Sequence, residues 1–247
     1  MILVADIGNS RVKWARADGG GLGESAADAY QDDTLADVLD SRWRQQTPPE
    51  AVAYCCVGAS AAGAVLEAWV ARTWEVRTTR VRTEASGFGV RCAYDKPETL
   101  GADRWAALVG AWHKHGKAAC IVDCGTAITL DALSGEGVHL GGVILPGVDL
   151  MRYALSARTD GIPPDVIDDT SVLAASTSAG MGAGTMHAAA AGVDRIVKEM
   201  RSSLPVDSMT LVTGGDAARL TPLFTMDFVP DPDLVLFGLA VIAGVIR

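Results

Sequence analysis

One short pattern occurs twice in this chain and constrains its fold more than any other feature. An apolar run that ends in an aspartate is followed by a glycine turn and a second alternating run. The first copy spans residues 2–14 with the acid at Asp6, and the second spans residues 121–131 with the acid at Asp123. Each copy is typical of two strands joined by a tight turn. Because the aspartates lie half a chain apart, the repeat predicts two similar folded halves.

The two turns also indicate a chemistry. Glycine lets the backbone approach a ligand closely and direct its N–H groups outward, and such groups bind phosphate. Thr126, together with Ser10 or Asn9, adds side-chain donors. An aspartate beside bound phosphate usually organises a divalent cation, often through water. A single Asp-x-Gly also occurs in ordinary hairpins, but two copies in matched strand context favour the phosphate interpretation.

Two such turns resemble the phosphate loops of the acetate and sugar kinase, Hsp70 and actin superfamily. The resemblance implies an α/β fold of two duplicated ribonuclease H-like domains with a nucleotide cleft between them. We expect the N-terminal domain to span residues 1–116 and the C-terminal domain residues 117–247.

Composition narrows the class of protein. With 247 residues, 49% hydrophobic and 21% charged, the chain can build the cores of an ordinary globular protein. Its net charge of −9 argues against nucleic acid as a partner, because phosphate backbones favour lysine and arginine. The five cysteines include no C-x-x-C pair, so we expect reduced thiols in a cytoplasmic protein.

No membrane segment or signal peptide is expected. The first apolar run is too short for a signal peptide and lacks a basic lead. Residues 170–193 are uncharged if His187 is neutral, but they are too rich in Ser, Thr and Gly for a spanning helix. Residues 234–246 are strongly apolar and short, so both stretches are expected to be buried helices.

Hydrophobic periodicity predicts the remaining elements. A hairpin is expected over residues 1–15, with further strands at 51–57, 76–81, 118–123, 128–132, 138–144, 209–213 and 226–229. Helices are expected at 34–44, 61–74, 101–115, from 147 to about 157, at 173–200, from 217, and at the C-terminal end. Residues 83–97 read as a linker, and residues 160–169, with Pro163 and Pro164, as a surface loop. Gly180, Gly182 and Gly184 should weaken the first turns of the long helix.

The most specific stretch is residues 94–105, with the order Tyr, Asp-x-Pro and Leu-Gly-x-Asp-Arg-Trp. Asp103 and Arg104 lie at the expected start of a helix, where the backbone dipoles attract negative charge. Taken alone, a helix-capping aspartate beside a locally paired arginine is the simpler interpretation. The order of the whole motif, however, resembles the pantothenate-binding segment of type III pantothenate kinases.

That resemblance implies ATP-dependent phosphorylation of pantothenate to 4′-phosphopantothenate, the first step of coenzyme A biosynthesis. It makes Asp103 the general base that accepts the proton of the primary hydroxyl of pantothenate. This role agrees with phosphoryl transfer, which needs an oriented oxygen nucleophile. The implied substrate contacts are Tyr94, Gly101, Ala102, Asp103, Arg104 and Thr177. Arg104 would bind or position the substrate carboxylate.

The same resemblance covers the nucleotide and the cofactors. The implied ATP-binding residues are Asp6, Ile7, Gly8, Asn9, Ser10, Arg11, Val12, Lys13 and Thr126. Asp6 would organise Mg²⁺ through water, and Asp123 would bind a monovalent cation, K⁺ or NH₄⁺. Ser10 stands where threonine is also common, which changes little because either hydroxyl can donate.

Three further stretches fit the family. Residues 141–147 match its G-G-x-I-x-P-G turn and read as scaffold close to the substrate. Residues 176–181 resemble a segment whose threonine comes from the partner subunit of a homodimer, which nominates Thr177, although Gly180 replaces an expected alanine. Residues 213–217 resemble the adenosine-side glycine turn, yet a glycine pair between strand and helix is common. We interpret Asp131 as a solvated strand end, the four histidines as surface or packing residues, and the six tryptophans as scattered, with Trp105 and Trp112 in the core.

Two alternatives remain open at this point. The chain could be another small-molecule kinase of the same superfamily, against which residues 94–104 argue. It could also be a non-catalytic accessory protein of transcription. The presence of Asp6, Asp103 and Asp123 argues against lost catalysis, and the acidic charge argues against direct DNA contact.

Overall fold

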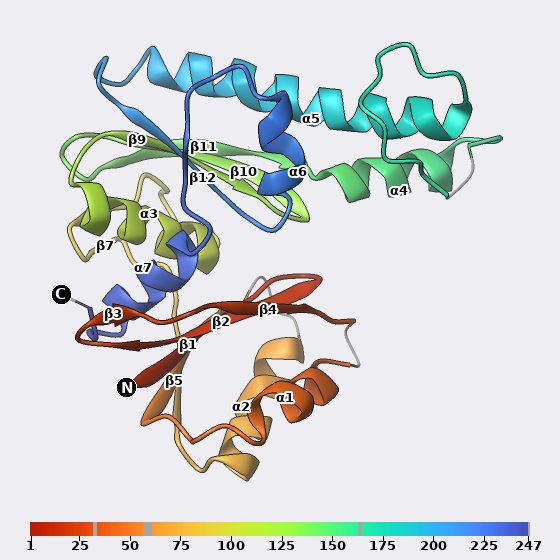
Figure 1. Cartoon of the computed structure of the whole chain (residues 1–247). Coiled ribbons are helices and arrows are strands. Elements are labelled where there is room, and N and C mark those ends of the chain that lie inside the picture. The colour runs from red at the N-terminus through yellow and green to blue at the C-terminus, as the bar shows by residue number, and fades with distance from the viewer. Residues whose placement is uncertain (32–33, 57–60, 163–164, 247) are drawn as a thin grey trace. The chain divides into compact units, whose positions relative to one another are not determined.

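The computed structural model describes residues 1–31, 34–56, 61–162 and 165–246. The chain forms two compact units (Figure 1). The first unit contains Met1–Lys117, Glu136–Leu140 and Asp233–Arg247, and the second contains Ala118–Gly135 and Gly141–Pro232. These units differ from a single division at residue 117, because a short inner segment and the C-terminal segment belong to the first unit. The assignment of domain boundaries therefore stays a prediction.

Two sheets of the same topology form the centres of the units. The first has the order β3-β2-β1-β5-β6, with β4 paired to β2, and the second has the order β11-β10-β9-β12-β13. In both, the first hairpin is antiparallel, whereas the two following pairs are parallel. The strands of the first sheet are β1 (Ile2–Ile7), β2 (Arg11–Asp18), β3 (Gly21–Leu22), β4 (Ala26–Ala29), β5 (Ala51–Cys56) and β6 (Arg77–Arg80). Those of the second are β9 (Ala119–Cys124), β10 (Ala127–Leu133), β11 (His139–Pro146), β12 (Met209–Thr213) and β13 (Val229–Pro230).

The repeated aspartates occupy matching positions in the two sheets. Asp6 is the second-last residue of β1, and Asp123 is the second-last residue of β9. Asp6 pairs with Lys13 on its antiparallel neighbour and with Cys55 on its parallel neighbour. Asp123 pairs in the same way with Thr129 and Thr213. The repeat in the sequence is therefore a repeat of topology, with one carboxylate at the same strand end in each unit.

Helices α1 (Leu35–Trp43), α2 (Ala61–Thr73), α3 (Ala102–His115) and α7 (Leu234–Ile242) belong to the first unit. Helices α3 and α7 approach closely because both have a glycine at the crossing. A Cβ on Gly238 would lie 1.8 Å from the carbonyl oxygen of Ala106, and one on Gly110 would lie 2.6 Å from that of Leu234. Only glycine allows this backbone separation. The strongly apolar C-terminal stretch is thus a core helix of the first unit, as expected.

Four tryptophans gather in the core of the first unit, between the sheet and helices α1 and α2. Trp43 is stacked on Trp74 with ring centroids 5.4 Å apart, and Trp14 and Trp69 meet Trp43 edge to face. Offset and edge-to-face contacts are the favoured geometries for aromatic pairs. The expectation that the tryptophans are scattered is wrong for these four, because residues far apart in sequence meet only in the folded core.

Helices α4 (Val148–Arg158), α5 (Thr177–Arg201) and α6 (Ala217–Leu220) belong to the second unit. Figure 1 shows the long α5 running across one face of the second sheet. Met186 and Val193 of α5 pack there with Cys120, Val122 and Leu130. This apolar face lies opposite the face that carries Asp123, because side chains alternate along a strand.

Several expectations need correction. The long helix begins at Thr177, not at residue 173, and continues unbroken through its three glycines. The linker at residues 83–97 contains a small hairpin, β7 (Ser86–Gly87) and β8 (Val90–Arg91). Asp131 is 2% exposed and is therefore a buried residue, not a solvated strand end. Val57, Pro163 and Pro164 lie outside the described residues. Among the described helices, none has the length and apolar character needed to cross a membrane.

Candidate active site

Asp6 carries a carboxylate whose pKa is strongly raised. Burial raises the pKa of Asp6 from 3.8 to about 6, and the nearby charge of Asp103 raises it as well. The thiol of Cys55 donates to Asp6 Oδ1 at 3.1 Å, and this bond together with Lys13 acts in the opposite direction. Two carboxylates that repel each other in a buried setting are typical of a site that receives a cation or a proton.

Asp103 lies in the first turn of α3, as the sequence predicts. Its carboxylate folds back over the helix start, because a Cβ on Gly101 would lie 2.3 Å from Asp103 Oδ1. The glycine of the Leu-Gly-x-Asp motif therefore makes room for the catalytic candidate. This side chain is held close to the N-terminal end of the helix, where backbone N–H groups stabilise negative charge.

Tyr94 and Arg104 of the substrate motif are in direct contact. Arg104 Nη1 donates to Tyr94 Oη at 3.2 Å, and the guanidinium carbon lies 5.9 Å from the centre of the Tyr94 ring. Arg104 is only 6% exposed, which is rare for a charged side chain. On the other side, the ring of His139 stacks on Tyr94 at 5.8 Å between centroids. The motif thus forms a small aromatic and cationic cluster.

The first phosphate turn presents its polar residues outward. Gly8 N donates to Arg11 O at 2.9 Å, and Tyr30 holds the carbonyl groups of Gly8 and Ser10. Asn9, Ser10 and Arg11 are exposed, whereas Ile7 and Val12 are fully buried. Ile7 and Val12 therefore present no exposed surface to a nucleotide, whereas the three polar residues between them do.

Lys13 lies on β2 directly beside Asp6 in the strand register. Its Nζ is 2.8 Å from Asp233 Oδ1 at the start of α7. Burial opposes ionisation of Asp233, but hydrogen bonds from Lys13 and Ser25 hold its pKa below the ordinary value. Lys13 thus tethers α7 to the sheet as well as placing a positive charge near Asp6.

The second turn is packed against the start of α4. Gly147 N donates to Thr126 O at 2.9 Å, and a Cβ on Gly147 would lie 2.3 Å from Gly125 O. The segment at residues 141–147, which the sequence predicts to be scaffold, therefore has a structural role in the second unit. It supports the turn that carries Thr126.

The glycine turn at residues 213–217 lies against Asp123. Gly214 has a φ of +98°, and a Cβ there would lie 2.5 Å from Asp123 Oδ1 and 2.4 Å from Cys124 N. Asp216 N donates to Cys124 O at 2.8 Å. Both the φ angle and the close approach require glycine at position 214. The turn therefore lies directly against the carboxylate of Asp123.

Thr177 is the first residue of α5 and is exposed. Ser176 caps the helix by accepting a hydrogen bond from Ala179 N at 3.2 Å. The side chain of Thr177 is thus presented at a fixed helix start.

The residues around both aspartates fit the implied cations. Among the residues that the structure describes, no three His, Cys, Asp or Glu side chains gather into a metal cluster. Mg²⁺ in nucleotide sites is commonly held by one or two carboxylates, water and substrate phosphates. The raised pKa of Asp6 shows that positive charge would be favourable there. Asp123 pairs in the strand register with Thr129 and Thr213, two residues that carry hydroxyl groups.

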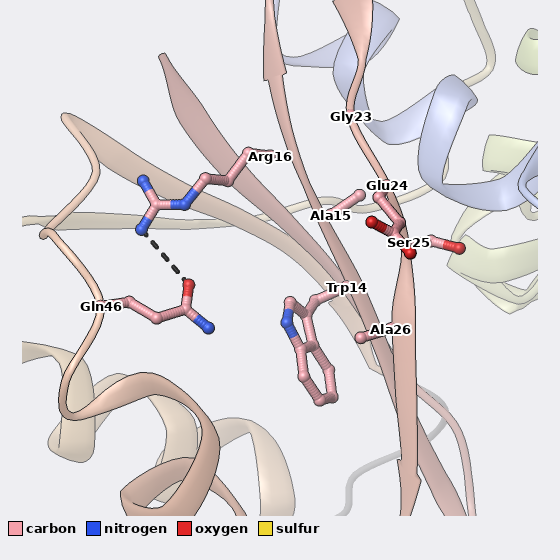
Figure 2. A pocket seen from close by; sticks show the side chains of 8 residues that line it. All are labelled: Trp14, Ala15, Arg16, Gly23, Glu24, Ser25, Ala26 and Gln46. Atoms are coloured by element: carbon pink, nitrogen blue, oxygen red, sulfur yellow. Dashed lines mark hydrogen bonds between the residues drawn. The ribbon is translucent and has the colours of Figure 1, made fainter.

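A separate hollow of about 400 Å³ lies on the first unit (Figure 2). Figure 2 shows Arg16 and Gln46 joined by a hydrogen bond on one side of it and Glu24 and Ser25 on the other. None of its lining residues is a predicted site residue. This hollow therefore does not mark the candidate active site.

Comparison with known proteins decides the family. The model of the type III pantothenate kinase family matches residues 2–199. A type III pantothenate kinase of Nitrosococcus oceani is 40% identical over 249 residues, covering 98% of this chain and 94% of that protein. This chain belongs to the type III pantothenate kinase family. A second member, from Halorhodospira halophila, is 36% identical over 245 residues, covering 97% of this chain and 96% of that protein.

Solved structures establish the fold class. A protein assigned to the Baf family of transcriptional activators from Campylobacter jejuni has a TM-score of 0.60 at 21% identity, covering 98% of this chain and 97% of that one. The ethanolamine utilization protein EutJ from Carboxydothermus hydrogenoformans has a TM-score of 0.56 at 13% identity, covering 97% and 88%. At these identities the likeness concerns the fold alone. Together with the repeated strand order it confirms the predicted α/β fold of two duplicated ribonuclease H-like domains.

Membership of the type III pantothenate kinase family also weighs on the alternatives. The match over nearly the full length favours a pantothenate kinase over another small-molecule kinase of the superfamily. Sequence reasoning did not find Cys55, which donates to Asp6, or His139, which stacks on Tyr94. Knowing that β5 lies parallel to β1 would have placed Cys55 beside Asp6. For His139 the sequence holds no comparable signal.

Proposed function

We propose that this chain transfers the γ-phosphoryl group of ATP to the primary hydroxyl of pantothenate, giving 4′-phosphopantothenate for coenzyme A biosynthesis. The observation that carries the proposal is the position of Asp103. Its carboxylate lies in the first turn of α3, folded over Gly101 and close enough to Asp6 to raise the pKa of that group. Family membership indicates the class of substrate, and this geometry indicates which residue acts as the base.

Asp103 acts as the general base in this proposal. Phosphoryl transfer requires little covalent chemistry from the protein, so orienting the hydroxyl and accepting its proton late are the main tasks of a base. The neighbouring Arg104 and Tyr94 position the substrate, and the guanidinium of Arg104 suits the pantothenate carboxylate. Gly101 and Ala102 contribute backbone groups at the helix start.

ATP is bound by the residues of the first turn, Asp6 to Lys13, and by Thr126 of the second turn. Asp6 would hold Mg²⁺, and Asp123 would hold K⁺ or NH₄⁺. When bound, these cations would supply positive charge beside the phosphates of ATP. The support for both assignments is the matching position of the two carboxylates in the repeated sheets.

We further propose that the protein is a homodimer. In the second unit, large apolar side chains are exposed on the edge strand β11, on α4 and on the loop before α5, including Ile144 at 64%, Tyr153 at 68% and Leu173 at 89%. Large apolar side chains that are exposed on several elements of one unit are typical of an interaction surface. A second copy of the chain would cover them. Thr177, which follows the same loop, would then complete the pantothenate site of the partner subunit.

The remaining proposals concern the cellular location of the protein and its binding partners. All five cysteines are free thiols, which supports a cytoplasmic location. The net charge of −9 argues against nucleic acid as a partner. Small acidic metabolites can still bind, because positive groups lie at the site.

A coupled ADP-release assay with pantothenate tests the proposal. Asp103→Asn should lower kcat by about 10²–10⁴, the usual contribution of a positioned base. Asp37→Asn is the matched control, because Asp37 is also an acid in the first turn of a helix of this unit, α1. A wild type that releases no ADP with pantothenate, or an Asp103→Asn protein with normal turnover, would contradict the proposal.

A further inference from the structure

Two arginines and three aspartates form a connected ion-pair network in the second unit. Arg219 of α6 lies 3.2 Å from Asp216 and 3.6 Å from Asp168. Arg152 of α4 lies 2.8 Å from Asp168. Asp149 joins both arginines, at 3.3 Å from Arg219 and 3.7 Å from Arg152. The network therefore links α4, α6 and the loop that precedes α5.

Arg152 is the fixed member of this network. It is 8% exposed, and its Nε donates to Thr185 Oγ1 of α5 at 3.1 Å. Thr185 Oγ1 in turn donates to Met181 O at 2.8 Å. A buried guanidinium requires its partners, because an unpaired buried charge is strongly unfavourable. Arg152 therefore anchors the carboxylate of Asp168 against α5, and its hydrogen bond is the main reason why the pKa of Asp168 is lowered.

The loop that carries Asp168 is attached to the first turns of α5. Ser178 Oγ accepts from Ile167 N at 2.9 Å and donates to Asp165 O at 2.6 Å. A Cβ on Gly182 would lie 2.1 Å from Ile167 O, so the loop backbone rests directly on the helix. Since Ser178 follows Thr177, the placement of the loop and the placement of Thr177 depend on each other.

The other end of the network reaches the glycine turn beside Asp123. Asp216 follows Gly214 and Gly215, and its backbone N–H binds the carbonyl group of Cys124. Arg219 contacts the side chains of both Asp216 and Asp168. One guanidinium thus connects the turn that resembles the adenosine-side glycine turn of the family with the loop before Thr177.

Stability alone does not explain this arrangement. Asp149 and Asp168 have side chains that are 72% and 73% exposed. Ion pairs that involve such exposed carboxylates add little to stability, because water and salt screen them. A planar guanidinium shared between two segments is better suited to fixing their relative position, because its donors point in set directions.

We propose that Arg219 and Asp168 couple the two substrates: nucleotide bound at residues 214–216 strengthens pantothenate binding through the placement of Thr177. The inference deepens the proposed function: it rests on the role proposed there for Thr177 and on the resemblance of this turn to the adenosine-side glycine turn of the family. Nucleotide fixes the turn and with it Asp216, Arg219 is then held in one orientation, and Asp168 keeps the loop on α5. By linkage, pantothenate must strengthen nucleotide binding by the same factor.

Calorimetric titration of the full-length protein tests the coupling. The Kd of pantothenate is measured without nucleotide and with saturating Mg²⁺ and the non-hydrolysable analogue AMPPNP. The wild type should bind pantothenate about fivefold or more tightly in the presence of the analogue, within the usual range for coupled sites. In Arg219→Gln the two Kd values should agree within about twofold, because the coupling factor falls towards one. Arg195→Gln is the matched control and should keep the wild-type ratio, since Arg195 forms an exposed ion pair with Glu199 on α5.

Asp168→Asn breaks the same bridge from the other side and serves if Arg219→Gln does not fold. A wild-type ratio of one, or a ratio that neither variant changes, would overturn the inference. The proposed function fails by a different result, either no phosphorylation of pantothenate by the wild type or an unchanged pantothenate KM in Thr177→Ala. The two failures are therefore distinguishable.

Discussion

Replacing Asp6 with asparagine should stabilise the metal-free protein, although it removes the carboxylate proposed to contact ATP and Mg²⁺. Burial raises the pKa of Asp6 from 3.8 to about 6, with a further contribution from Asp103, so the folded state holds an ionised carboxylate at a disadvantage. Asparagine has nearly the same shape and can still accept the hydrogen bond from Cys55. It carries no charge to be repelled by Asp103.

The sign and size of the effect follow from the pKa difference. Between pH 4 and 6 the folded protein retains a proton that the unfolded chain releases, so this group makes the free energy of unfolding fall as pH rises. Above about pH 6 the whole penalty is present. A shift of two pKa units corresponds to an upper limit of about 3 kcal/mol. Because Asp6 is partly exposed, we expect Asp6→Asn to be more stable than wild type by about 1–3 kcal/mol at pH 7.5 and equal to it near pH 3.5.

Urea unfolding in EDTA without nucleotide measures this difference across the pH range. Fluorescence of the tryptophans that cluster in the first unit reports the unfolding of that unit. Glu24→Gln, which removes an exposed acid, is the control and should show no such pH dependence. If Asp6→Asn is no more stable than wild type at pH 7.5, or gains equally at pH 3.5, the reasoning about the Asp6–Asp103 pair is refuted.

Three further outcomes test the site assignments. Asp123→Ala should abolish the stimulation of ADP release by K⁺, and an unchanged K⁺ midpoint would move that site elsewhere. Gly101→Ala should lower kcat by up to about 10²-fold. Because the φ of −55° at this position tolerates alanine, the loss would come from displacement of the Asp103 carboxylate by the new Cβ. A normal kcat would contradict this prediction. Asp103→Asn and Thr177→Ala proteins, each weak alone, should recover about a quarter of wild-type activity when co-refolded, because half the dimers are mixed and hold one intact site. Activity equal to the mean of the two parents, despite subunit exchange, would place both residues in one chain's site.

Features set by neighbouring residues could be predicted from the sequence. The hairpins at Asp6 and Asp123 depend on an apolar run and a glycine turn, both of which are local patterns. The start of α3 at the Leu-Gly-x-Asp-Arg motif was also found within one residue. The start of α5 was missed because apolar Val172 and Leu173 extended the helical pattern backwards. Ser176, the residue that caps this helix, was a usable signal for the true boundary.

Features set by tertiary contacts could not be predicted in this way. Asp131 lies on a strand with alternating apolar residues, and nothing in its own sequence context shows that both faces of the sheet are covered. Cys55 and Asp6 are 49 residues apart and meet through parallel pairing. The network around Arg219 joins positions up to 70 residues apart in the chain. Each depends on which strands and helices become neighbours, which periodicity within one element cannot specify.

The two repeated aspartates lie in different surroundings, which bears on the different roles proposed for them. Asp6 and Asp123 occupy the same strand position, so the strand itself cannot distinguish their roles. The residues around them do: Asp6 faces Cys55 and the charge of Asp103, whereas Asp123 faces the hydroxyl-bearing Thr129 and Thr213 and the backbone of Gly214. Repulsion from a second carboxylate favours a doubly charged cation near Asp6. The proposal that Mg²⁺ binds near Asp6 and a monovalent cation near Asp123 therefore rests on the different neighbours of the two carboxylates.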